Sequence, residues 1–347
     1  MKVSISVGSA YYDGSDWEGL VDYVRAADRL GVDTVWSAEA WGMEAVASLG
    51  YLAAVTENIR LGTGIMQISA RTPAATAMSA LALDQISNGR FSLGLGVSGP
   101  QVVEGLHGEP FAKPLGRLRE YMEIVRMAMD GDRIIYDGEH HTLPRPGGQG
   151  KALKLAIPPR PDLPIYLATL GPKSLELTGE LADGWVGTSF IPEHADVLLD
   201  PIRAGAGRAG RTLADIDLQV STQVAVSDDV DALLERARTG MAFTLGGMGS
   251  ATTNFYNSAY SRAGYADVAE RVQRLWVEGD KQAAAAAVPD ELLLDAYPIG
   301  THDMVAKRVQ AIADAGVDAI RVGPTGRTTA EQIEHLEMTV DLAASAS

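Results

Sequence analysis

The chain has 347 residues, a length that suits two domains of about 150 residues or one large α/β barrel. Its 29 basic and 45 acidic side chains give a net charge of −16, which argues against nucleic acid and anionic membrane surfaces as main partners. The sequence contains no cysteine, which excludes disulfides, thiolate metal sites and cysteine nucleophiles.

The N-terminal sequence MKVSISVG alternates polar and apolar residues and lacks the apolar run of a signal peptide. It therefore predicts a first strand. No apolar run along the chain approaches the roughly 18 residues of a membrane span, so we expect a cytoplasmic protein.

One pattern recurs along the chain: an amphipathic helix, a Gly or Asn that ends it, and a short β-rich strand. The first copy has a helix over residues 17–30 with Asp16 as a predicted N-cap, then Gly31, then a strand over residues 32–37. The later copies lie at residues 49–65, 77–95, 173–188 and 304–322.

Strands that alternate with helices in this order predict parallel βαβ units. Eight such units in one chain predict a closed (β/α)8 TIM barrel, whereas an open doubly wound sheet needs fewer strands. The predicted strands begin near Val3, Asp33, Arg60, Phe91, Pro164, Trp185, Asp217 and Asp318.

Two intervals between strands are too long for one βα unit and predict insertions, at about 101–163 after strand four and 227–298 after strand seven. The first contains a Pro/Gly-rich surface loop at 143–150, and the second has mostly helical patterns. Insertions on βα loops lie at the C-terminal face of a barrel, where ligands bind. We therefore predict one barrel domain over residues 1–347 with both insertions at the active-site face.

Glycine-rich segments follow two of the predicted strands. Gly94–Gly99 matches GxGxxG, but three βα units precede it and Pro100 follows it, which argues against a Rossmann dinucleotide site. A strand end that lets a flat ligand approach the backbone fits better. Gly62–Ile65 fits two interpretations equally well: small residues that relieve crowding, or a backbone surface for a planar ring.

Glu39 follows the second predicted strand between Trp36 and Trp41, and a carboxylate at a strand's C-terminal end faces the barrel mouth. Burial at that place would raise its pKa and suit proton transfer; the alternative is a helix-capping residue. Lys173, just after strand five, either meets an anionic cofactor tail or is a solvated lysine at a helix start. The six histidines show no metal-binding spacing, so we expect no protein-bound catalytic metal.

Several strand-end motifs, in their order along nearly the whole chain, resemble the bacterial-luciferase-like superfamily and, within it, the coenzyme F420-dependent oxidoreductases. Glucose-6-phosphate dehydrogenases and methylenetetrahydromethanopterin reductases that use F420 are similar. The motifs are at residues 33–42, 58–65, 71–74, 83–91, 93–99, 164–168, 171–172 and 181–185.

This resemblance implies a (β/α)8 barrel, commonly dimeric, that holds the deazaflavin at the strand C-termini. It implies a bulge with a non-prolyl cis peptide at Gly64–Ile65 against the ring, and an acidic residue, Glu39, near the ring. The matching segments Ser98–Gly99 and Ala168–Gly171, the latter including Thr169 and Leu170, would approach the cofactor's tail and its phosphate.

The sequence departs from the sugar-phosphate dehydrogenases of this family. They have Asp-His where Glu39–Ala40 stand, a catalytic glutamate that aligns with Pro100, and a cofactor-contacting asparagine that aligns with Val103. The resemblance therefore implies the same cofactor with a different substrate chemistry. We expect Ala40, Trp41, Pro100 and Val103 to line the substrate pocket.

Our first hypothesis is an F420-dependent oxidoreductase that transfers a hydride between deazaflavin C5 and a small organic substrate, as a reductase of an activated double bond. Glu39 would polarise the ring or substrate or relay a proton. An FMN-dependent monooxygenase on the same barrel is the first alternative. A non-catalytic ligand-binding barrel or subunit is the second. We expect a homodimer that takes a small-molecule substrate.

Overall fold

The computed structural model describes residues 1–8, 16–249 and 253–346. Its main sheet is parallel in every pair of strands whose register is defined, and it has the order β3-β2-β1-β13-β10-β9-β8-β5-β4. A further pairing of β3 with β5 joins the ends of this order and gives a closed (β/α)8 barrel. The strands are β1 (Lys2–Gly8), β2 (Thr34–Ala38), β3 (Arg60–Thr63), β4 (Met66–Gln67), β5 (Phe91–Gly96), β8 (Ile165–Leu167), β9 (Gly184–Gly187), β10 (Asp217–Ser221) and β13 (Ala319–Val322).

All eight predicted barrel strands are confirmed, with starts within one residue of those expected from the sequence. The additional strand β4 has two residues and was not predicted. The helices are α1 (Trp17–Arg29), α2 (Ala45–Val55), α3 (Pro73–Ile86), α4 (Pro100–Gly105), α5 (Pro114–Met129), α6 (Pro172–Leu181), α7 (Asp196–Arg208), α8 (Val230–Gly246), α9 (Phe255–Tyr260), α10 (Ala266–Val277), α11 (Lys281–Ala286), α12 (Asp290–Ala296), α13 (His302–Asp314) and α14 (Thr329–Ser345).

The predicted caps of the first helix are confirmed. The Asp16 carboxylate accepts a hydrogen bond of 2.8 Å from the Gly19 amide and so satisfies one of the free N–H groups of the first turn. Gly31 follows the helix with φ +75°, a left-handed conformation that favours glycine. The apolar residues that the sequence pattern places on one face of this helix are the residues buried in the structure.

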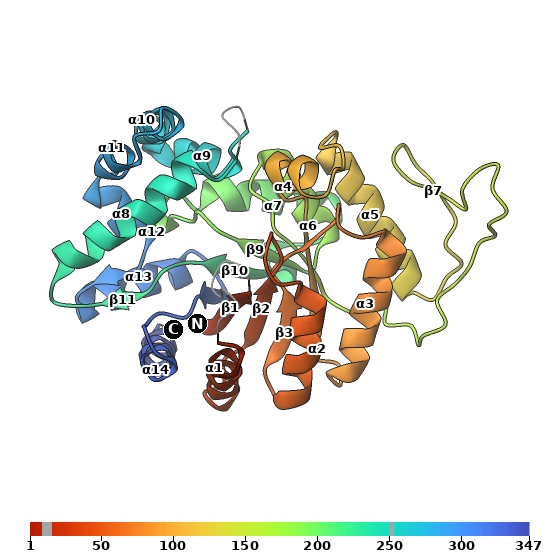
Figure 1. The fold of residues 1–347 in the computed structure, drawn as a ribbon, viewed down its shortest axis with the longest axis horizontal. Helices are drawn as coiled ribbons and strands as arrows, with labels where there is room; N and C mark the ends of the chain where they lie inside the picture. The colour runs from red at the N-terminus through yellow and green to blue at the C-terminus, as the bar shows by residue number, and fades with distance from the viewer. Residues whose placement is uncertain (9–15, 250–252, 347) are drawn as a thin grey trace. The chain divides into compact units, whose positions relative to one another are not determined.

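Contacts divide the chain into two compact units. The first, here the N-terminal unit, comprises Ile5–Ala168 and Leu181–Gly184, and the second, here the C-terminal unit, comprises Met1–Ser4, Thr169–Glu180 and Trp185–Ser347. In the N-terminal unit, α1, α2, α3 and α5 follow one another around the outside of the strands (Figure 1). Large buried side chains such as Trp36, Leu49 and Phe91 form its core.

The interval after β5 contains α4, α5 and a small antiparallel hairpin of β6 (Tyr136–Asp137) and β7 (Thr142–Leu143). Helix α5 packs against α3, where the hydroxyl oxygens of Tyr121 and Thr76 are 2.6 Å apart, so α5 is one of the barrel's own helices. The predicted Pro/Gly-rich surface loop at 143–150 contains no regular structure after Leu143 and is mostly exposed. The inserted residues of this interval therefore come both before and after α5 in the sequence.

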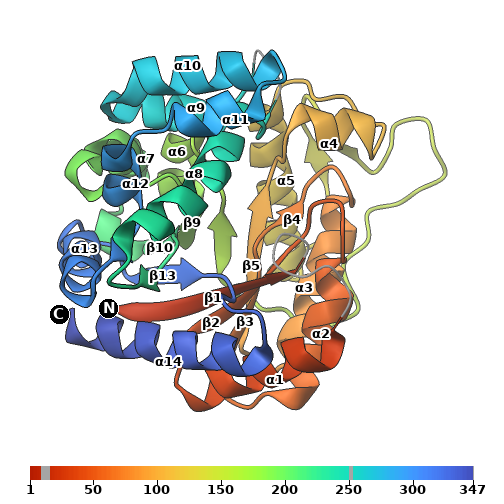
Figure 2. The same cartoon turned by 60° about the vertical axis from the view of Figure 1, so that its left-hand side comes forward.

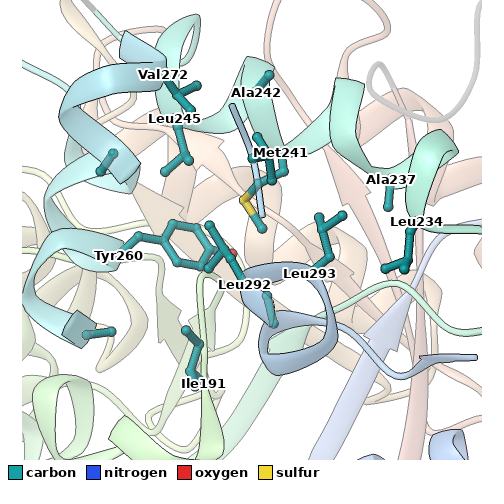
Figure 3. Packing of buried hydrophobic residues seen from close by; sticks show 14 of the residues in the cluster. Ile191, Leu234, Ala237, Met241, Ala242, Leu245, Tyr260, Val272, Leu292 and Leu293 are labelled. Carbon is teal, nitrogen blue, oxygen red and sulfur yellow. The ribbon is translucent and has the colours of Figure 1, made fainter. Parts of the chain in front are cut away.

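The interval after β10 is mostly helical, as its sequence pattern predicts. Helices α8 to α12 lie together in the C-terminal unit (Figure 2). They enclose a buried apolar cluster in which Met241, Tyr260 and Leu292 face one another (Figure 3). A short pair of parallel strands, β11 (Ala225–Val226) and β12 (Ile299–Gly300), brackets this helical segment. Within the described ranges, no helix has the length and apolar character needed to cross a membrane.

Candidate active site

Four neighbouring strands of the N-terminal unit bring the predicted site residues to one edge of the sheet. Glu39 follows β2, Gly64–Ile65 follow β3, Ser98–Gly99 follow β5, and Ala168 follows β8. These strands are parallel and pair in the order β2, β3, β5 and β8, so their C-terminal ends are adjacent.

Glu39 is held by an arginine that the sequence analysis gave no role. Arg71 Nη1 donates to Glu39 Oε2 at 2.7 Å, and Arg71 Nη2 donates to Oε1 at 2.8 Å. The backbone amide of Gln67 adds a third hydrogen bond to Oε2 at 3.2 Å. Both side chains are largely buried, with 9% of Glu39 and 18% of Arg71 exposed. This bidentate geometry fixes the orientation of the Glu39 side chain.

Arg71 also forms an ion pair with Glu44, which caps α2 by accepting hydrogen bonds from the amides of Val46 and Ala47. The hydrogen bond with Glu39 raises the pKa of the Arg71 guanidinium above its usual value. Glu44 therefore has the helix-capping role that the sequence left open for Glu39. The signal for Arg71 was its place in the motif Arg71–Ala74 directly after a glycine-rich strand.

The strand-end glycines make room mostly for protein atoms. A Cβ on Gly62 would lie 2.4 Å from the Trp36 indole ring, and one on Gly94 would lie 1.9 Å from the carbonyl oxygen of Thr63. Relief of crowding is therefore the correct interpretation for Gly62 and Gly94. The Gly64–Ile65 peptide bond is cis, as the resemblance implied.

The Ile65 side chain covers β5 next to this peptide bond. Its Cγ1 would be 2.9 Å from a Cβ on Gly96, and the Ala168 Cβ would be 3.7 Å from the same point. Small residues at both places let the isoleucine lie flat across the strand end. Ser98 has φ +59°, in the left-handed region, just before Gly99 and the start of α4.

A pocket of about 400 Å³ opens beside the ion pair within the N-terminal unit. Arg71, Tyr121 and Phe111 line it, together with Val103 of the predicted substrate-pocket residues. Burial raises the pKa of Tyr121 to about 12, although its hydrogen bond with Thr76 opposes this change, so the phenol stays neutral at physiological pH. Sequence reasoning missed Tyr121 because helical spacing marks it only as a core residue.

The other predicted substrate residues do not line this pocket. The Ala40 carbonyl accepts a hydrogen bond of 3.0 Å from Gln67 Nε2, Trp41 is 67% exposed, and Pro100 is the first residue of α4.

Thr169, Leu170 and Gly171 belong to the C-terminal unit and directly precede α6. The Thr169 hydroxyl lies 2.7 Å from the Thr178 hydroxyl, and its carbonyl accepts a hydrogen bond of 3.0 Å from the Trp185 indole N–H. The Gly171 carbonyl accepts one of 2.9 Å from the Ser174 hydroxyl. These bonds fix the loop in one conformation.

Lys173 is 77% exposed, and its ammonium group is 3.0 Å from a Glu176 carboxylate oxygen. Lys173 is thus a solvated residue at the start of α6 in this structure, and its contact with an anionic cofactor tail stays a prediction. In the part of the chain that the structure describes, no three His, Asp or Glu side chains form a group suited to a metal ion.

The strand order and the polar cluster at the strand ends define a (β/α)8-barrel protein with its site residues at the C-terminal edge of the strands. A family model described as luciferase-like monooxygenase matches residues 1–319. The chain belongs to this luciferase-like family.

Three relatives show the likeness over nearly the whole chain. A Mycobacterium tuberculosis protein named "Putative coenzyme F420-dependent oxidoreductase" is 40% identical over 344 residues, which are 97% of this chain and 98% of that protein. The 5,10-methylenetetrahydromethanopterin reductase of Archaeoglobus fulgidus is 32% identical over 90% of this chain and 91% of that protein. The structure of the coenzyme F420-dependent tetrahydromethanopterin reductase from Methanopyrus kandleri matches with a TM-score of 0.79 at 24% identity, covering 99% of this chain and 98% of that one.

Proposed function

We propose that this protein is a coenzyme F420-dependent oxidoreductase that transfers a hydride between deazaflavin C5 and a small organic substrate. The observation that carries the proposal is the 40% identity to the M. tuberculosis protein, which extends over 97% of the chain and includes the strand-end segments. The 32% identity to a methylenetetrahydromethanopterin reductase supports the same cofactor.

The residues at the strand ends fit such a cofactor. Gly96 and Ala168 place no large side chain beside Ile65, so the surface there is flat, which suits a planar ring system. The buried Oε1 of Gln67 has no hydrogen-bond partner among the described residues, although its Nε2 is fully engaged by the Glu39 and Ala40 carbonyls. This side chain ties the segment after β3 to the backbone beside Glu39.

When bound, the deazaflavin supplies the hydride chemistry at C5. Gly64 and Ile65 would support the ring, while Ser98–Gly99 and Ala168–Gly171 would hold the tail. Glu39 is the proposed catalytic carboxylate. Because Arg71 donates hydrogen bonds to both of its oxygens, we assign Glu39 the role of orienting and polarising the ring or substrate. A proton relay through Glu39 would first require the Arg71 hydrogen bonds to open.

We further propose that the substrate has an activated double bond, such as an enone or imine. Oxidation of an alcohol needs a general base at the substrate hydroxyl. Ala40 and Pro100 stand where the family's sugar-phosphate dehydrogenases have ionisable residues, and neither can act as a base. Reduction of a double bond needs only a hydride from the cofactor and a proton, which water can provide. Ala40, Trp41, Pro100 and Val103 remain the proposed substrate contacts.

The test is a fluorescence titration of the purified protein with F420, reduced F420 and FMN. The proposal expects micromolar binding of both forms of F420 and no binding of FMN. Binding of FMN alone would move the protein to the monooxygenase branch of the family. Failure to bind any of the three would favour a non-catalytic barrel and overturn the proposal.

A further inference from the structure

One face of α5 forms a wall of the pocket of about 400 Å³ in the N-terminal unit. Arg117 and Tyr121 both line the pocket and are four residues apart on this helix, so their side chains lie on the same face, about one turn apart. The Tyr121 hydroxyl donates a hydrogen bond of 3.1 Å to the Arg71 carbonyl. The Tyr121 side chain therefore spans the distance from α5 to Arg71, and the two arginines line the pocket from different elements.

Arg117 has no ion pair among the described residues. Its Nε donates a hydrogen bond of 2.9 Å to the Ala112 carbonyl, which holds the side chain in place. Neither of its Nη atoms has an acceptor in the described part of the chain, and neither is buried. Arg71, in contrast, is bonded to Glu39 and Glu44. An arginine whose two outer nitrogen atoms are accessible and free has the geometry for bidentate binding of a carboxylate.

The surroundings of Arg117 favour an anion. Glu120 accepts hydrogen bonds from three backbone amides of the β6–β7 hairpin, and Glu104 accepts one of 3.2 Å from the Phe111 amide, so both carboxylates are engaged. Glu109 also lines the pocket, but it is exposed, so water screens its charge. Arg117 lies in the first turn of α5, a helix of 16 residues, whose N-terminus adds a partial positive charge.

Much of the remaining lining suits a flat apolar body. Val97, Val103 and Phe111 contribute apolar side chains, and the Tyr121 ring adds an aromatic surface. The volume is at the lower end of the range of about 300–1,000 Å³ that is typical of small-molecule sites. A substituted benzene ring fits this volume. The pocket therefore combines an apolar lining with one accessible cation.

We propose that this pocket binds the substrate and that the substrate is an organic acid, with its carboxylate on Arg117 and its apolar body against Phe111 and Val103. The inference rests on the proposed function, because that function places the reacting end of the substrate beside Glu39. It narrows the substrate class from any small molecule with an activated double bond to one that also carries a carboxylate. Arg117 is then a residue that determines specificity and takes no part in hydride transfer.

The test uses para-carboxybenzylideneacetone, an enone with a carboxylate at its far end, and the methyl ester of this acid, which has nearly the same shape without the charge. Binding of both to wild type, Arg117→Gln and Arg117→Lys would be measured by isothermal titration calorimetry, with and without F420. Arg119→Gln is the matched control. It removes the same charge from the same helix, at a residue that lies outside the pocket lining and pairs with Glu123.

We expect wild type to bind the acid at least about tenfold more tightly than the ester. R117Q should weaken binding of the acid by about ten- to a hundredfold and leave binding of the ester unchanged, because only the acid loses a charge-assisted hydrogen-bonded pair. R117K should lie between, and R119Q should match wild type. Phe111→Ala should weaken binding of acid and ester by the same factor, since the two compounds share their apolar body.

Equal affinities of wild type for acid and ester, or failure to bind the acid, would overturn the inference. Equal losses in R117Q and R119Q would also overturn it, because they would show only the effect of net charge. If the acid binds as expected but F420 does not bind, the binding site stands and the proposed function fails. If reduced F420 converts acid and ester equally well and R117Q changes neither rate, the proposed function stands and the inference fails. Should R117Q not fold, the same comparison between wild type and R117K decides.

Discussion

Arg71 donates two hydrogen bonds, of 2.7 and 2.8 Å, to the two carboxylate oxygens of Glu39. Glu39 lies at the end of strand β2, and Arg71 lies in the segment after β4. The planar fork of arginine matches the two carboxylate oxygens, which fixes the direction of the glutamate side chain. The pair lies beside the pocket that Arg71 itself lines. This geometry holds an arginine–glutamate ion pair in one orientation at the candidate active site.

Breaking this pair should cost stability and function together. We expect Arg71→Met to lower the free energy of unfolding by about 1–3 kcal/mol, because Glu39 keeps a largely buried charge without its partner. Arg71→Lys should retain more stability, yet lose affinity for F420, since a point charge cannot make the bidentate bond. Urea unfolding and F420 titration measure both effects.

Arg25→Gln, which removes an exposed pair with Asp22, is the control and should change stability by less than about 0.5 kcal/mol. Equal effects of R71M and R25Q would contradict the account.

The packing of Trp36 against the strand-end glycines predicts which glycines tolerate a methyl group. Gly62→Ala should destabilise by about 1–3 kcal/mol through overpacking against the indole, and Gly94→Ala by more, because its Cβ meets a backbone carbonyl. Gly50→Ala on α2 should stabilise by about 0.5–1 kcal/mol, since a Cβ there meets nothing within 4 Å.

The double variant Gly62→Ala/Trp36→Phe separates overpacking from other causes. Phenylalanine lacks the second ring of the indole, which the new methyl group would meet, so the double variant should lose less stability than the sum of the two single changes. Additive losses in urea unfolding would show that the Gly62 contact with Trp36 does not determine the effect.

The sequence was sufficient for the barrel and for the strand ends at which the predicted site residues lie, because helix caps such as Asp16 and turn glycines such as Gly31 act locally. It could not reveal the partners of those residues. Arg71 and Glu39 are 32 residues apart, and the folded barrel brings their segments together. The same limit applied to Gly62 and Gly94, whose space is taken by Trp36 and Thr63 from other strands.

Glu120 of α5 predicts a pH dependence of stability. Burial raises the pKa of this carboxyl, but backbone amides of Glu139, His140 and His141 and the His141 ring bind it, and its net pKa falls below the usual value of 4.5. A carboxyl with a lowered folded-state pKa adds stability that is present above pH 4.5 and is lost as the pH falls below it. Wild type should therefore lose more stability than Glu120→Gln between neutral pH and pH 3, as measured by urea unfolding. Parallel pH profiles would contradict this role.

An exposed apolar face on α2 and α3 supports the proposal of a homodimer. Tyr51, Met78 and Ile86 are 50%, 56% and 56% exposed on these two helices. Large exposed apolar side chains of this kind occur at interaction surfaces. We expect wild type to have twice the chain mass by light scattering and Met78→Glu to be monomeric or much weaker. Leu106→Glu, which changes an equally exposed apolar residue beyond α4, should stay dimeric. A monomeric wild type would overturn the proposal.

Transfer of a labelled hydride tests the central claim most directly. F420 reduced with deuterium at C5 would be mixed with the protein and a panel of enones and imines, and each product analysed by mass spectrometry and NMR. The account predicts one deuterium on the carbon that accepts the hydride, with the rate strongly reduced in Glu39→Gln and retained in Arg25→Gln. Reduced product without deuterium, or equal rates in Glu39→Gln and wild type, would contradict it.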